Sequence, residues 1–187
     1  LNKPFNNIKR NWFITPNAMG LNFRGLILMG LAINFIGFQI GWFACVIGAA
    51  KGYPLLSTAV VSFIIVLHLC RVNNVYSELS LIISAVVIGI IWESLLVASD
   101  WLSYSSSIDA FFAPIWLVAM WALFATTINV SMAWLKNRWL LASSMGAIFG
   151  PLAFIAGEKL GAVQFIDRPS ALLALALGWA SLMPLLL

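Results

Sequence analysis

The sequence predicts an all-α, polytopic membrane protein: a bundle of six transmembrane helices with both termini in the cytoplasm (N-in/C-in). Of the 187 residues, 63% are hydrophobic and 9% are charged, whereas a soluble domain carries about 25% charged residues. The apolar residues form runs of about 20, the length at which a helix crosses the bilayer core. These runs lack the polar–apolar alternation of barrel strands, so helices are the expected spanning elements.

The predicted elements divide the chain into a short leading segment and one membrane domain. Residues 1–24 are polar and basic, with interleaved aromatic residues, and we expect a cytoplasmic segment lying partly on the membrane surface. Residues 25–187 form the transmembrane domain. Its six apolar runs are 26–49, 54–70, 79–98, 111–135, 139–157 and 171–187. The connections between them are too short to hold a soluble domain.

The orientation follows from the placement of Lys and Arg, which concentrate in cytoplasmic loops. With the N-terminus inside, seven basic residues fall on the inner side and three on the outer side. The inner residues are Lys3, Lys9, Arg10, Arg24, Arg71, Lys136 and Arg138, and the outer ones are Lys51, Lys159 and Arg168. The basic residues lie between apolar runs rather than along one face, which argues against nucleic acid as a partner.

A stripe of small residues runs along the first predicted helix. Gly30, Gly37 and Gly41 recur at helical spacing, and Gly37 and Gly41 form a GxxxG pair that permits close approach of helices. Gly146 and Gly150 form a similar stripe on the fifth run. Packing within the chain is the simpler interpretation of both stripes. The alternative is that the first stripe docks a membrane-protein partner or a lipid.

Glu93 is the most informative polar residue, because it lies inside the predicted helix 79–98. An acid at that depth costs about 3 kcal/mol on insertion scales, so it should face protein or a water-filled cavity. Glu93 is therefore a candidate for ligand binding or for carrying a proton. Asp100 follows seven residues later and is expected on the same face. The alternative is a carboxyl tied to a neighbouring helix.

Other polar residues give weaker candidates. Asn34, Gln39 and Asn129 are possible ligand-binding amides, and Asn34 and Asn129 are placed to form a polar seam between the first and fourth helices. Interhelical hydrogen bonds explain these amides equally well. His68 and Arg71 lie one helical turn apart, a spacing that suits a phosphate headgroup. A solvated loop at the interface is the favoured alternative for this pair.

The sequence contains no motif for a metal or a cofactor. It has a single histidine, which excludes bis-histidine haem and a histidine-rich metal site within the chain. It also lacks a P-loop, a dinucleotide fingerprint and a nucleophile elbow. We therefore expect no cofactor, no bound metal and no catalytic residue, and an enzyme is the less favoured class.

Four segments carry a resemblance to a known family. Residues 34–43, 113–127, 150–154 and 177–184 resemble the uncharacterised bacterial inner-membrane proteins that contain the domain of unknown function 2878. The resemblance extends from about residue 34 to the end of the chain. It implies a multi-pass protein of the bacterial inner membrane and brings no activity. At position 93 the family pattern has aspartate, so this chain keeps the acid with a longer side chain.

Three functions agree with these patterns. The favoured one is binding or moving a small hydrophobic or lipid-like molecule, with membrane lipids as the expected partners. The second is an accessory or substrate-binding subunit, similar to the membrane components of energy-coupling-factor transporters, which would dock through Gly37 and Gly41. The third is an intramembrane lipid-modifying enzyme that relies on Glu93 with help from Asp100.

Overall fold

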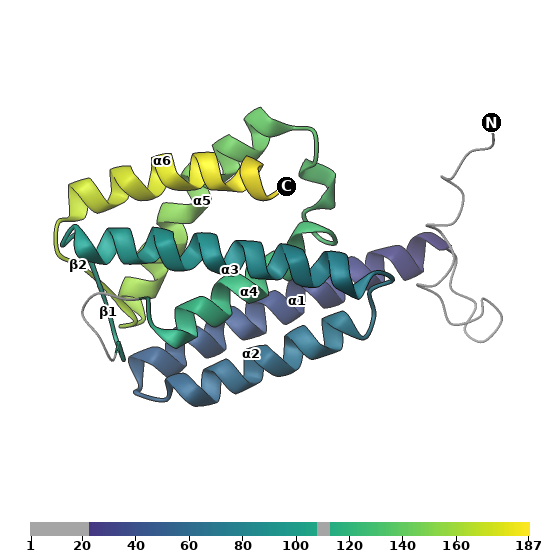
Figure 1. The fold of residues 1–187 in the computed structure, drawn as a ribbon, viewed down its shortest axis with the longest axis horizontal. Helices are drawn as coiled ribbons and strands as arrows, with labels where there is room; N and C mark the ends of the chain where they lie inside the picture. Colours follow the sequence, from purple (N-terminus) through teal and green to yellow (C-terminus); the bar gives the residue numbers. More distant parts are fainter. Residues whose placement is uncertain (1–22, 108–112) are drawn as a thin grey trace.

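The computed structural model describes residues 23–107 and 113–187, which are mostly helical (Figure 1). These residues form six α-helices, which confirms the predicted helical fold. The helices are α1 Phe23–Ala50, α2 Pro54–Leu69, α3 Val75–Ala98, α4 Ile115–Ile128, α5 Trp139–Lys159 and α6 Arg168–Leu186. Nearly all of the predicted leading segment 1–24 lies outside the described residues, as does the start of the predicted run 111–135.

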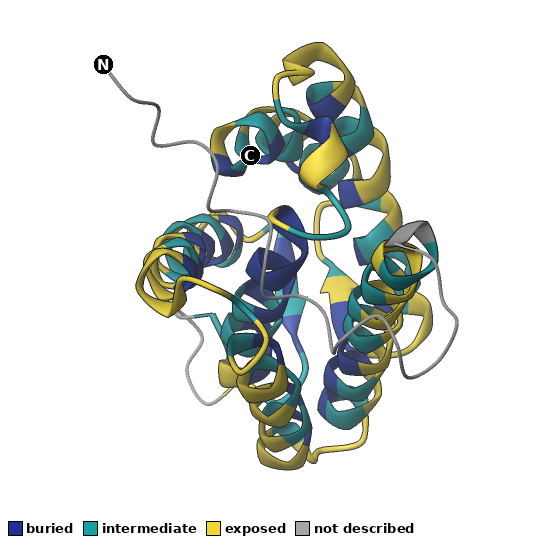
Figure 2. Cartoon of the chain, turned by 90° about the vertical axis from the view of Figure 1, so that its right-hand side faces the viewer, coloured by how far each residue is buried: buried dark blue, intermediate teal, exposed yellow. Residues whose placement is uncertain are grey.

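Four of the helices are long and apolar enough to cross a membrane, namely α1, α3, α5 and α6. The other two are apolar but shorter, with 16 residues in α2 and 14 in α4. Large apolar residues such as Leu28, Leu55, Ile91 and Leu173 are exposed. Figure 2 shows that the exposed positions lie along the outward sides of the helices. A soluble bundle would carry polar residues there, so this surface is that of a membrane protein.

The helices form a group of four and a hairpin. α1 to α4 pack together, while α5 and α6 pack mainly on each other. α4 is the centre of the group, because it contacts α1, α2 and α3 and nine of its 14 residues are buried. The hairpin joins the group through contacts of α6 with α3 and through a small ribbon of two strands.

The ribbon pairs the segment after α3 with the segment after α5. Strand β1 (Leu102–Tyr104) runs antiparallel to β2 (Val163–Phe165). Strands of three residues are too short to give a recognisable alternation, so the sequence does not predict them. The turn after α1 lies at the same end of the molecule as the ribbon, and the turns after α2 and α4 lie at the opposite end (Figure 1).

Two helix boundaries differ from the prediction for local reasons. α3 begins four residues early, because the Asn74 side chain caps it by accepting a hydrogen bond from the Ser77 N–H at 3.1 Å. The predicted run 111–135 is not one helix. α4 ends at Ile128, and a short 3₁₀ turn η1 (Ala133–Leu135) follows. The hydroxyls of Thr126 and Thr127 bond back to carbonyls in the last turn of α4, and such bonds compete with continued helix.

Candidate functional site

An apolar cavity of about 550 Å³ lies between α1 and the α5–α6 hairpin, with α4 forming its inner wall. Four of its lining residues, Phe35 and Phe43 on α1 and Phe149 and Leu152 on α5, are also exposed on the outer surface. The cavity therefore opens sideways between α1 and α5. Its other residues are Phe38, Gln39, Trp42, Val46, Glu93, Trp116, Leu117, Met120, Trp121, Phe124, Met132, Met145, Gly146, Gly150, Ala153, Phe154, Gly157, Val163, Trp179 and Met183.

Glu93 lies in the wall of this cavity and is fully buried. One carboxylate oxygen accepts a hydrogen bond from the Tyr104 hydroxyl at 2.5 Å, and the other accepts one from the indole N–H of Trp121 at 3.0 Å. No Lys, Arg or His within the described residues forms an ion pair with it. Glu93 thus links α3 to both α4 and β1, which agrees with the alternative of a carboxyl tied to a neighbouring helix.

Tyr104, whose hydroxyl donates to Glu93, lies outside the helices in strand β1. Burial, together with the charge and the hydrogen bond of Glu93, raises the pKa of Tyr104 well above its ordinary value. The phenol therefore stays protonated at neutral pH and remains a donor to the carboxyl. Its ring packs edge-on against Trp116, with the ring centroids 6.0 Å apart. The ribbon thereby positions a donor that no motif in the sequence indicates.

Two tryptophans form the inner end of the cavity. The rings of Trp121 on α4 and Trp179 on α6 are stacked, with centroids 5.0 Å apart and planes 10° from parallel. Gly89 on α3 packs against the Trp121 ring, and Gly150 on α5 packs against the Trp179 ring, so a Cβ at either glycine would overlap the indole. Gly146 contacts the Trp179 backbone in the same way. The stack is a continuous layer across four helices.

The first glycine stripe is mostly filled by the chain itself. Gly37 faces Ile64 of α2, and Gly41 faces Leu123 of α4. Gly30 has no neighbour within 4 Å of the position of a Cβ. At Gly37 and Gly41 the contacts therefore agree with packing within the chain, which was the simpler interpretation.

The predicted amides lie in three different surroundings. Asn34 donates to the Thr126 carbonyl at 3.1 Å and accepts from the Ser131 hydroxyl at 2.8 Å, so it joins α1 to the end of α4. Asn129 instead donates to a carboxylate of α3, that of Glu78. Gln39 is exposed in the cavity lining, and its side chain has no hydrogen-bond partner among the described residues.

A second polar cluster lies at the opposite end from the ribbon, and Glu78 is its centre. The buried Glu78 carboxylate contacts His68 Nε2 at 2.8 Å and accepts from the Asn129 side chain at 2.8 Å. The Lys136 ammonium donates to the side-chain oxygen Oδ1 of Asn129 at 2.6 Å. The sequence groups Glu78 with His68 and Arg71 in one cluster on the inner side and favours a solvated loop there. The structure instead buries the Glu78 carboxylate between His68 and Asn129.

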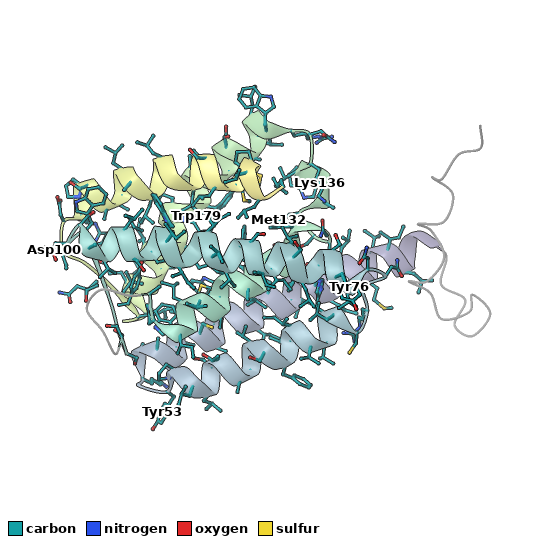
Figure 3. All side chains as sticks on the ribbon, viewed as in Figure 1. Tyr53, Tyr76, Asp100, Met132, Lys136 and Trp179 are labelled. Atoms are coloured by element: carbon teal, nitrogen blue, oxygen red, sulfur yellow. The ribbon has the colours of Figure 1, made fainter. Side chains whose placement is uncertain are left out.

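Two predicted residues lie apart from these clusters. Arg71 follows α2 and is exposed, and it donates to the Leu67 carbonyl in the last turn of α2 rather than joining His68. Asp100 is exposed and has a positive φ of 54°, because α3 ends at Ala98. The expectation that Asp100 shares a helical face with Glu93 is therefore wrong, since the helix has stopped before it. Figure 3 shows Asp100 at the ribbon end, distant from Trp179.

The fold and the site define a helical membrane protein with an aromatic, laterally open cavity. Residues 31–185 match the family model described as protein of unknown function (DUF2878), and the chain belongs to this family. This confirms the resemblance found in the sequence. No curated protein and no solved structure gave a significant match to the chain.

Proposed function

We propose that the protein crosses the inner membrane of a bacterium six times, with both termini inside, and binds a small hydrophobic or lipid-like molecule in its cavity. The alternation of the helices supports the six crossings. Tyr53 and Asp100 lie at one end of the bundle, and Tyr76 and Lys136 lie at the other (Figure 3). The short helix α4 has nine of its 14 residues buried among its neighbours, and a helix enclosed by protein need not match the full thickness of the bilayer.

The observation that carries the binding proposal is the sideways opening of the cavity. Its volume of about 550 Å³ lies in the range of roughly 300–1,000 Å³ that ligand sites occupy. Its mouth is made of Phe35, Phe43, Phe149 and Leu152, on a surface that faces lipid in the proposed topology. A hydrophobic molecule enters such a site from the bilayer without crossing water, and methionines and aromatic residues adapt to its shape.

The same contacts give less support to the two alternatives. A partner docking at Gly37 and Gly41 would meet positions that Ile64 and Leu123 already fill. An intramembrane enzyme would need an acid–base pair, yet Asp100 does not line the cavity that Glu93 borders.

Photo-crosslinking with an alkyl diazirine tests the proposal in proteoliposomes. We expect label on peptides that contain Phe35–Phe43 and Met145–Phe154. Ala153→Trp fills the cavity and should remove most of this label. Ile148→Trp is the matched control, because Ile148 lies on the same helix, is exposed and is outside the lining. Equal labelling of the two variants, or label spread evenly over all lipid-facing helices, would contradict a binding site here.

A further inference from the structure

We propose that the cavity selects an uncharged single-chain amphiphile: an apolar chain with one neutral group that both donates and accepts a hydrogen bond, as in a long-chain alcohol. This inference rests on the proposed function and narrows its ligand to a chemical class. Three features of the lining carry it: the absence of cations, the closed surroundings of Glu93, and the free amide of Gln39.

An anionic head finds no partner in the cavity. None of the residues in the described lining is Lys, Arg or His. A carboxylate or phosphate moved into this apolar space would lose its hydration without gaining an ion pair, which is strongly unfavourable. The only ionisable group in the wall is Glu93, which cannot attract an anion. Fatty acids and phospholipid headgroups are therefore disfavoured.

A cationic headgroup is also disfavoured, although the carboxyl of Glu93 borders the cavity. Glu93 has no exposed surface, and each of its oxygens already accepts a hydrogen bond, from Tyr104 or from Trp121. An aromatic face would be the other partner for a cation. The Trp121 ring has Gly89 on one side and Trp179 on the other, so neither of its faces is free. A protonated amine therefore finds neither a free acceptor on Glu93 nor a free face on the adjacent Trp121 ring.

Gln39 is an amide in the cavity lining that a ligand can reach. It lies near the middle of α1, is exposed in the lining, and has no partner among the described residues. An amide in hydrocarbon without a partner is unfavourable, so a ligand that satisfies it gains free energy. The amide offers two donors and an acceptor, and a hydroxyl offers both functions in return. A neutral hydroxyl is thus the simplest complement.

The walls indicate one chain rather than two. The lining follows α1 from Phe35 to Val46, which corresponds to about 16 Å of helix. Over this length the opposite wall is α5, from Met145 to Gly157, and it is apolar throughout. An apolar space of this length, in a cavity of about 550 Å³, suits a single alkyl chain with its hydroxyl at Gln39.

A headgroup series tests the inference with the full chain in nanodiscs of neutral lipid. Dodecanol, dodecanoate, dodecylamine and dodecane compete with the alkyl diazirine for labelling of Met145–Phe154. We expect dodecanol to compete at about tenfold lower mole fraction than the carboxylate or the amine. Gln39→Leu should weaken the competition by dodecanol about three- to tenfold, which is the affinity that one hydrogen bond within the membrane contributes. The same substitution should leave the competition by dodecane unchanged, so dodecane is the internal control for correct folding of the variant.

The outcomes separate the two proposals. The proposed neutral ligand class is wrong if dodecanoate or dodecylamine competes as well as dodecanol. It is also wrong if Gln39→Leu lowers the competition by dodecanol and by dodecane equally. In both cases the cavity remains a binding site. If none of the four compounds competes and Ala153→Trp has no effect, both the ligand class and the proposed function are wrong.

Discussion

Glu93 shows how one residue within a membrane helix is stabilised by partners from two other elements. A buried carboxyl is tolerated when its oxygens are hydrogen-bonded. Here one donor comes from α4 and one from the β ribbon, each on a separate oxygen. The acid is therefore a structural link, whatever ligand the cavity takes.

Removal of this carboxyl should destabilise the protein strongly. Glu93→Leu leaves the Trp121 N–H and the Tyr104 hydroxyl buried without an acceptor, at about 1–3 kcal/mol each. We expect a loss of about 2–5 kcal/mol in the free energy of unfolding, measured by denaturant titration in detergent micelles. Glu93→Leu combined with Tyr104→Phe should recover part of it, because one unpaired donor is gone. A Glu93→Leu protein as stable as the wild type would contradict the link.

The pair His68 and Arg71 separates in the structure, and mutation should show this. His68→Leu removes a partner of the buried Glu78 and should cost about 1–3 kcal/mol. Arg71→Ala removes an exposed side chain that bonds only to the nearby Leu67 carbonyl, so its effect should stay within about 0.5 kcal/mol. Thermal unfolding of the two variants in one detergent compares them. Equal losses would show that the two residues act together after all.

At the element scale, the helices pack closely where a glycine of one helix contacts the tryptophan ring of another. Gly89 and Gly150 let α3 and α5 approach the Trp121–Trp179 stack from its two sides. The stacked rings bury a large apolar area and have the offset contact that aromatic pairs favour. Three of the four segments that resemble the family meet in this layer, in 113–127, 150–154 and 177–184.

Alanine substitution should change stability in opposite directions at Gly89, which is closely packed, and at Gly30, which has open space around it. Gly89→Ala places a Cβ against the Trp121 ring and should destabilise by about 1–3 kcal/mol. Gly30→Ala has nothing within 4 Å and should stabilise by up to about 1 kcal/mol through helix propensity. Unfolding transitions of the two variants measure this. A neutral Gly89→Ala would show that α3 and α4 are not closely packed.

The sequence predicts elements much better than it predicts contacts between them. The apolar runs locate all six helices, and four of these helices have the length and composition that a bilayer crossing requires. Burial of Glu93 also follows from its depth. Its donors do not, because Tyr104 and Trp121 reach it only once the ribbon and α4 are in place. The cavity is unpredictable for the same reason: it is a space left between α1 and the hairpin, and no local pattern encodes it.

On the scale of the whole molecule, the turns and the basic residues lie at the two opposite ends of the helix bundle. Arg71, Lys136 and Arg138 follow α2 and α4, while Lys51, Lys159 and Arg168 lie at the ribbon end. This division is the one expected if the end with the turns after α2 and α4 is cytoplasmic.

Cysteine labelling tests the orientation. Tyr53→Cys and Tyr76→Cys replace side chains that are 63% and 88% exposed at opposite ends (Figure 3). In a background with Cys70→Ser, and with the buried Cys45 left in place, a membrane-impermeant maleimide should label position 53 in intact spheroplasts. Position 76 should react only after permeabilisation. The reverse pattern would invert the topology, and labelling of both positions from outside would contradict the alternating crossings.

The β ribbon also sets the order in which the molecule is completed. Leu102 pairs with Phe165, 63 positions later. Synthesis proceeds from the N-terminus, so β1 reaches its side of the membrane before its partner strand exists. α1 to α4 are made first, and the far wall of the cavity arrives only with α5. The cavity between α1 and the hairpin is therefore complete only once α5 and α6 have been made.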